Sequence, residues 1–172
     1  TFSALNVYGA SMITTLGGGL LNAEYAYYDS KDDERGDNPL IPNSQTRLLI
    51  GYEQELVKNL TGSVQWYVER HHDYQALLNS SLSPDDAPAQ SRIWLTQRLV
   101  YRAMQQTLTL NLFNFYSTTD EDGYIKFQMN YSPVDSWRLS TGFNLFHGQS
   151  KRTFFGQFED ASNAFVRYRY FY

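Results

Sequence analysis

The chain contains no cysteine and no long apolar segment. Without cysteine, both a zinc–thiolate site and a disulfide-stapled scaffold are excluded. Helical membrane spans are excluded as well, because no run of about 18 apolar residues occurs and the mean hydropathy is −0.50. Helical periodicity is scarce, since no long stretch places apolar residues at i, i+3, i+4 and i+7.

A basic surface is also absent. The formal net charge is −4 over 172 residues, which argues against a dedicated nucleic-acid binder, because phosphate contacts need clustered Lys and Arg. The length predicts one domain, residues 1–172. The first residues lack both an initiating Met and the basic start and apolar stretch of a secretory signal, so we expect a processed chain or a fragment.

What the sequence does contain is period-two alternation, which predicts an all-β chain. Near the C-terminus, Ala164, Val166, Tyr168 and Tyr170 alternate with more polar neighbours that include Arg167 and Arg169. The same alternation recurs in Leu21–Tyr28, Arg47–Leu56, Leu60–Glu69, Arg92–Arg102, Leu108–Leu112, Ile125–Tyr131 and Trp137–Gly148, with a weaker segment inside Ala4–Ile13. Phe113, Asn114 and Phe115 blur the pattern and predict a bulge.

The connections between these segments alternate in length. Short ones are predicted at Thr15–Gly18, Val57–Asn59, Ala103–Gln106 and Pro133–Ser136. Longer polar ones are predicted at Lys31–Asn43, Gln75–Ser91 and Gln149–Ser162, with a short acidic one at Thr119–Gly123. One end of the sheet should therefore carry tight turns and the other end loops.

The 14 tyrosines are the most unusual feature of the composition. Aromatic residues lie near strand ends on the apolar faces, where they predict an aromatic girdle of Trp66, Tyr101, Tyr131, Trp137, Tyr168, Tyr170 and Tyr172. Such rings suit a bilayer interface. Together with the alternation, they predict an antiparallel meander transmembrane β-barrel. A soluble lipocalin-like barrel is the competing interpretation.

The last segment, Asn163–Tyr172, resembles the C-terminal assembly signal of bacterial outer-membrane β-barrels, with Tyr172 in place of the usual terminal Phe. The segments Gly142–Gly148 and Thr153–Glu159 resemble the closing hairpin of porin-like proteins of the alginate-export or general porin type. The resemblance implies the outer membrane of a Gram-negative bacterium. It also implies contact with the lipid bilayer and lipopolysaccharide, and recognition by the barrel-assembly machinery through the C-terminal strand. It names no substrate.

About nine strands are predicted, whereas bacterial barrels usually contain an even number. We therefore expect the C-terminal part of a larger even-stranded barrel, completed by missing N-terminal strands or by a second chain. The alternative is a complete eight-stranded barrel in which residues 1–18 form a periplasmic or plug tail.

Assigning the polar faces to a lumen predicts two charged walls. The acidic wall comprises Glu24, Glu53, Glu55 and Glu69, and the basic wall comprises Arg98, Arg102, Lys126, Arg138, Arg167 and Arg169. Residues 1–86 hold 12 acidic and 5 basic side chains, against 6 and 9 in residues 87–172. Facing walls would set up a transverse field and attract anions on the basic side. Alternatively, these charges could pair between strands and plug the barrel.

Catalysis is not expected. His71 and His72 are adjacent and should point to opposite faces at the loop end of a strand. His147 should lie on the apolar face near the outer rim.

Two acidic clusters could bind Ca²⁺ or bridge lipopolysaccharide phosphates, but solvated loop charge is the favoured interpretation. They comprise Asp29, Asp32, Asp33, Glu34 and Asp37, and Asp120, Glu121 and Asp122. No cofactor is called for.

The sequence thus predicts a porin-like channel for passive diffusion of small hydrophilic solutes, with a lumen biased toward anions on one wall. The alternative function is a closed small barrel with a structural, adhesion or partner-binding role through its extracellular loops.

Overall fold

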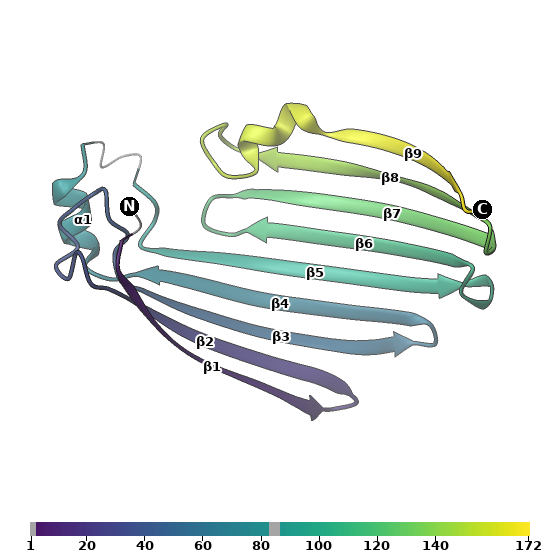
Figure 1. The fold of residues 1–172 in the computed structure, drawn as a ribbon, viewed down its shortest axis with the longest axis horizontal. Coiled ribbons are helices and arrows are strands. Elements are labelled where there is room, and N and C mark those ends of the chain that lie inside the picture. Colours follow the sequence, from purple (N-terminus) through teal and green to yellow (C-terminus); the bar gives the residue numbers. More distant parts are fainter. Residues whose placement is uncertain (1–2, 83–86) are drawn as a thin grey trace.

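The structure is a computed structural model that describes residues 3–82 and 87–172, and it consists of one antiparallel meander. Nine strands follow each other in sequence order, so that every strand pairs with its chain neighbour (Figure 1). The strands are β1 (Leu5–Leu16), β2 (Gly19–Ser30), β3 (Gln45–Val57), β4 (Leu60–His71), β5 (Ser91–Ala103), β6 (Leu108–Ser117), β7 (Asp122–Val134), β8 (Trp137–Gly148) and β9 (Asn163–Tyr170). The predicted all-β meander is confirmed.

Tight turns lie at one end of this sheet, as predicted. The β1–β2 turn is built from Gly17 and Gly18, both at positive φ, as a two-residue hairpin requires. Asn59 takes the same left-handed conformation between β3 and β4. The β5–β6 turn contains the short 3₁₀ segment η2 (Met104–Gln106).

Long connections lie at the opposite end and carry two helical segments that the sequence pattern did not indicate. The connection between β4 and β5 contains α1 (Tyr74–Ser80), and that between β8 and β9 contains the 3₁₀ helix η3 (Gly156–Ala161). Within the described ranges, neither helix is of the length and apolarity needed to cross a membrane. In Figure 1 the N-terminus lies at this loop end and the C-terminus at the turn end.

The pairing register is continuous through β6, so the expected bulge at Phe113–Phe115 is wrong. Phe113 pairs with both Arg98 and Lys126, and Phe115 pairs with Thr96 and Tyr124. These two rings interrupt the sequence pattern because they are apolar residues on the polar face, and they leave the ladder unshifted. Irregularities occur instead between Glu55 and Val57 and between Tyr131 and Val134.

The described residues form a single-layer sheet without an ordinary core. Among the described residues, Val100 is the only buried hydrophobic side chain. The chain exposes 11502 Å², whereas a compact soluble monomer of 19.9 kDa exposes about 8,700 Å². Large apolar side chains such as Met12 (54% exposed) and Val166 (76%) therefore lie open on the surface.

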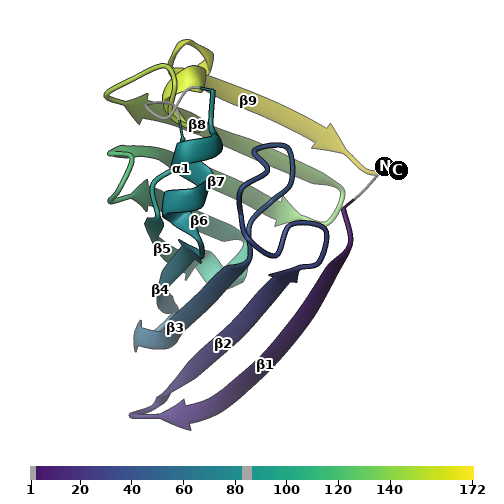
Figure 2. The same ribbon diagram turned by 90° about the vertical axis from the view of Figure 1, so that its left-hand side faces the viewer.

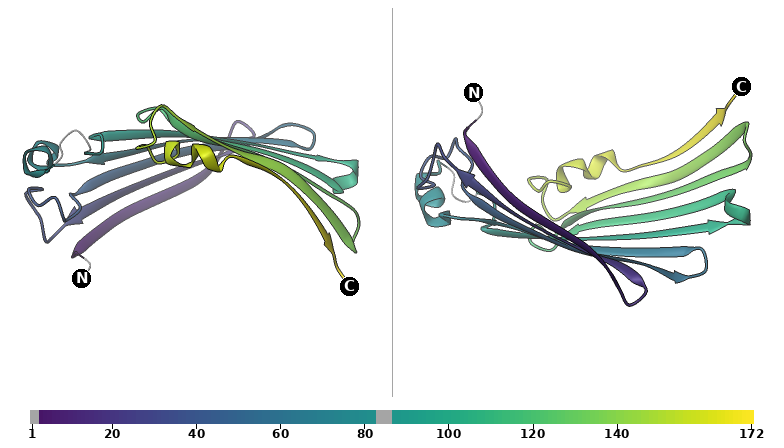
Figure 3. Two further views of the ribbon diagram at one scale, coloured as in Figure 1. Left: turned by 90° about the horizontal axis from the view of Figure 1, so that it is seen from above. Right: turned by 60° about the horizontal axis from the view of Figure 1, so that its bottom comes forward.

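The sheet curls without closing. Figure 2 and Figure 3 show an arched sheet whose edge strands, β1 and β9, both bend toward the same side. In the described chain, β1 pairs only with β2 and β9 only with β8. Both edge strands run from the loop end to the turn end. Each strand runs opposite to the one before it, so the first and the last of nine strands point the same way.

Candidate functional site

The two faces of the sheet differ in their predominant chemistry, and the polar face, which carries most of the charged strand residues, is the candidate site. The register aligns the apolar positions of all neighbouring strands, as in the row formed by Ala23, Ile50, Trp66 and Leu95. It brings every predicted wall residue to the opposite, polar face, namely Glu24, Glu53, Glu55, Glu69, Arg98, Arg102, Lys126, Arg138, Arg167 and Arg169. The predicted division of the strands into two faces thus holds throughout the described sheet.

The polar face lies on the inside of the curl. A cavity of about 380 Å³ on this face is lined by Ile13 of β1 and by Phe113 of β6, together with residues of the four strands between them. Strands neighbouring in a sheet are about 4.8 Å apart, so side chains from β1 and β6 can share a cavity only when the sheet bends toward them.

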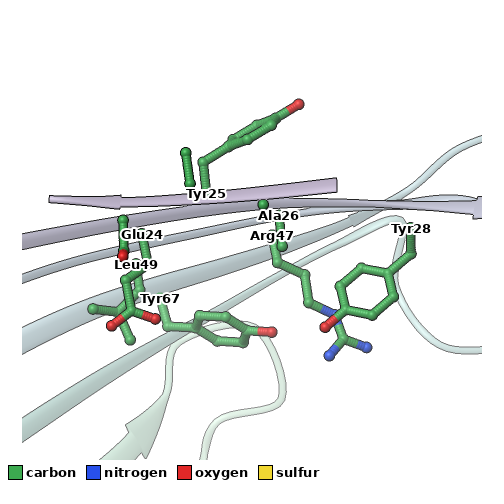
Figure 4. A pocket seen from close by; sticks show the side chains of 10 residues that line it. Glu24, Tyr25, Ala26, Tyr28, Arg47, Leu49 and Tyr67 are labelled. Carbon is green, nitrogen blue, oxygen red and sulfur yellow. The ribbon is translucent and has the colours of Figure 1, made fainter. Parts of the chain in front are cut away.

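A second cavity, of about 400 Å³, lies nearer the loop end and is lined by aromatic rings and charges. In Figure 4, Glu24, Arg47, Tyr28 and Tyr67 extend from one side of the strands, while Tyr25 points to the other side. This picture displays the alternation of the two faces directly.

Charged and aromatic side chains form a continuous chain of contacts at this end of the polar face. Arg47 Nε lies 3.3 Å from Glu69 Oε2, and the Arg47 guanidinium stacks 4.3 Å above the Tyr28 ring. The Tyr67 hydroxyl donates to Glu69 at 3.2 Å, and the Tyr67 ring stacks on Trp94 at 5.2 Å. One carboxylate thus fixes both a cation and a phenol on neighbouring strands.

The contact chain continues onto the β6–β7 turn through Arg92. Its guanidinium lies 4.9 Å from the Trp94 ring and 2.6 Å from Asp120 Oδ2. Asp120 also accepts a hydrogen bond from the Ser117 hydroxyl. The turn is therefore tied to the polar face of β5.

An aromatic cluster covers the polar face of the later strands, and sequence reasoning missed it. The Tyr124 ring stacks on Phe146 at 4.7 Å and on Phe155 at 6.0 Å, and Phe115 meets Phe155 edge-on at 5.1 Å. Phe155 belongs to the β8–β9 connection, so this loop folds back onto the polar face. The only sequence signal was the irregular pattern at Phe113–Phe115.

The acidic loop clusters are not simply solvated charge, and that interpretation is corrected here. Asp122 is fully buried and accepts the backbone N–H of Phe155 at 2.6 Å. Asp33 is 7% exposed and accepts the backbone N–H groups of Asp37 and Asn38. These carboxylates hold loop backbone in place, because buried acceptors need donors.

Exposed lysines in the long connections form ordinary surface ion pairs with nearby carboxylates. Lys151 donates to Asp160 at 2.6 Å, and Lys31 lies 2.8 Å from Asp29. Both hydrogen-bonded carboxylates raise the pKa of their lysine. Within the described part of the chain, no group of three or more potential ligands is arranged to hold a metal ion.

The basic wall is not neutralised by the acidic wall. None of its six members forms an ion pair with a described residue. Arg138 and Arg169 even lie directly opposite each other, both about 6 Å from the Phe171 ring. The Arg47–Glu69 contact is one example of the predicted cross-strand pairing, but the six predicted basic residues stay unpaired.

Six of the seven residues predicted for the aromatic girdle lie at the turn end of the sheet. Tyr101, Tyr131, Trp137, Tyr168 and Tyr170 all lie near that end on the apolar face, and Tyr172 follows the end of β9. Trp66 is the correction: it lies in the middle of β4, paired with Ile50 and Leu95. The sequence pattern predicted which face Trp66 lies on but not its position along the strand, because that position depends on where the strand begins.

The histidines lie where the alternation predicts. His71 faces the polar side, 3.5 Å from Glu69, whereas His72 meets the Tyr27 ring edge-on at 5.7 Å on the apolar side. His147 stacks on Tyr116 at 6.1 Å on the apolar face.

Comparison with protein-family models, with curated proteins and with solved structures finds no match to this chain.

Proposed function

We propose that the chain forms part of a porin-like outer-membrane β-barrel through which small hydrophilic solutes diffuse passively. The observation that carries this proposal is the predominantly apolar face, which extends over nine strands, is broadly exposed and is not covered by any other described segment. Leaving such a surface in water is strongly unfavourable. A bilayer covers it without a second protein layer, and a barrel satisfies the backbone at the same time.

The height of the apolar band supports a membrane. On β8, His147 stacks on Tyr116 near the loop end, and Trp137 meets Tyr131 edge-on at the turn end. Ten residues at about 3.4 Å each separate them by about 34 Å along the strand. A strand tilt of about 40° reduces this to about 26 Å, close to the apolar band of outer-membrane barrels.

Strand direction supports a larger barrel. Because β1 and β9 run the same way, an antiparallel seam between them requires an odd number of further strands. Preceding strands or a second chain would supply them, giving the even total common in these proteins. A complete eight-stranded barrel fits less well, because β1 pairs with β2 over its full length.

The unpaired basic wall supports a preference for anions. Six cations that face the inside of the curl without carboxylate partners leave positive potential along this wall of the proposed lumen. Planar-bilayer conductance of the full-length protein tests the proposal, with an anion-selective reversal potential expected in a KCl gradient.

Charge reversal sharpens this test. R138E and R167E should each reduce the anion preference, whereas K58E, in the β3–β4 turn, should leave it nearly unchanged. A protein that inserts but carries no current would overturn the channel and favour the closed barrel acting through its loops.

A further inference from the structure

The cavity of about 380 Å³ on the polar face is lined by charges of both signs. Glu24 comes from β2, Glu53 from β3 and Arg98 from β5. The acidic wall meets the basic wall here and in an adjoining cavity of about 290 Å³ that Glu53 and Arg98 also line, together with Arg102. Its volume lies at the lower end of the range for small-molecule sites.

These three charged groups do not satisfy one another. None of them forms an ion pair or a side-chain hydrogen bond with any described residue, although Arg47 and Glu69 on the same face do pair, at 3.3 Å. Glu53 and Arg98 flank Ser63 in one row, which separates their strands by about 9.6 Å. The arrangement leaves room between opposite charges for a solute that carries both.

The remaining lining is partly apolar. Ile13, Leu20 and Phe113 face the cavity alongside the uncharged donors and acceptors of Asn22, Gln65 and Thr96. Phe113 lies directly beside Arg98 in the ladder. An apolar group attached to a carboxylate could therefore contact the Phe113 ring while the carboxylate meets the guanidinium.

We propose that this cavity binds zwitterionic amino acids with an apolar side chain, as a selective step within the proposed channel on which this inference rests. The ammonium group is held by Glu53, the carboxylate by Arg98, and the side chain packs against Phe113, all in one row of the sheet. Glu24, four positions along β2 from the partner of Glu53, adds a second negative charge to the lining. A simple anion would face two uncompensated carboxylates, and a neutral sugar would leave all three charges unpaired.

Isothermal titration of the purified full-length protein in detergent tests the site directly. The probes are L-phenylalanine, its cationic analogue phenethylamine, its anionic analogue 3-phenylpropionate, and neutral N-acetyl-L-phenylalanine amide. L-Phenylalanine should bind at least about tenfold more tightly than each of the other three, since only it places both charges. E53Q and R98Q should each weaken its binding about tenfold, while E55Q, on the same strand outside the cavity, should not.

Phe113 controls the side-chain preference. F113A should reduce the preference for L-phenylalanine over glycine while leaving the binding of glycine nearly unchanged. Equal affinity for the four aromatic probes, or equal effects of E53Q and E55Q, would overturn the inference.

Conductance separates this inference from the proposed function. Current through the protein without a zwitterion preference in binding keeps the channel and rejects the site. Binding with the expected preference but no current keeps the site and rejects the channel.

Discussion

At the scale of single residues, Asp120 shows how one carboxylate connects separate parts of the polar face. It pairs with Arg92, whose guanidinium covers Trp94, and Trp94 in turn stacks on Tyr67. Arg92 and Asp120 are both mostly shielded, with side chains 24% and 19% exposed. The pair is therefore worth more than an open surface contact, because solvent screens it less.

Removing the charge of Asp120 should destabilise the sheet. D120N keeps the side-chain shape but leaves the Arg92 guanidinium without its counter-ion, which should cost about 1–2 kcal/mol. Urea unfolding of the protein in lipid vesicles measures this change. D135N, in the exposed β7–β8 turn, is the control and should have little effect. Equal stability of the two variants would show that the Arg92–Asp120 contact contributes nothing.

At the scale of elements, close approach of β7 and β8 depends on a residue without a side chain. A Cβ atom at Gly142 would overlap the backbone carbonyl oxygen of Phe127 on the neighbouring strand. Backbone cannot rotate away as a flexible side chain can. The two strands would have to separate locally.

G142A should therefore destabilise the sheet by about 1–3 kcal/mol. G9A is the matched control, since a Cβ at Gly9 would lie 3.4 Å from the Tyr25 carbonyl oxygen, an ordinary contact. The same vesicle unfolding experiment compares the two variants. If both alanines are tolerated equally, the β7–β8 approach is looser than described.

The β8–β9 connection is anchored mainly by Phe155, with one further ring contact between Phe158 and Phe146 at 5.8 Å. Phe155 combines ring contacts to Phe115, Tyr124 and Phe146 with a backbone hydrogen bond to Asp122. F155A should release this loop and speed tryptic cleavage after Lys151 or Arg152 about tenfold, because cleavage follows local opening. Mass spectrometry of the fragments measures the rate. Q157A, in the same loop, should cleave at the parent rate, and equal rates for both variants would contradict the anchoring role.

At the scale of the whole molecule, the proposed bilayer would give the two faces of the sheet different environments. The absence of cysteine allows neighbouring positions of β9 to be labelled one at a time. R167C, on the polar face, should react quickly with a water-soluble maleimide in the inserted protein, whereas V166C should be shielded by lipid. Both should react in the unfolded chain, which controls for intrinsic reactivity. Fast labelling at both positions would argue against a membrane on the apolar face.

Much of this architecture was predictable, because alternation acts at every position of a strand. The faces of Trp137–Gly148 and of Ile125–Tyr131, the turn positions and the loop positions all followed from local sequence. Contacts between distant segments did not follow. Nothing local shows that Phe155 packs on Tyr124, or that Asp122 is buried beneath a loop 33 residues away.

The position of a residue along its strand could not be predicted from the local sequence pattern either. The parity of Trp66 was correct, but its place at mid-strand depends on where β4 starts relative to β3 and β5. The charged cavity likewise arises only from register, since Glu53 and Arg98 are 45 positions apart in the chain and meet through Ser63. Register also places Phe113 directly beside Arg98, and curvature brings Ile13 of β1 to the same cavity.

The strict neighbour-to-neighbour order of the strands has a kinetic consequence. Every pairing of the described sheet joins segments that are consecutive in sequence, so each hairpin closes only a modest loop and the average contact is local. Local contacts lower the entropic barrier to folding. The sheet can therefore assemble by adding one hairpin after another to an existing edge, with each finished hairpin serving as the template for the next.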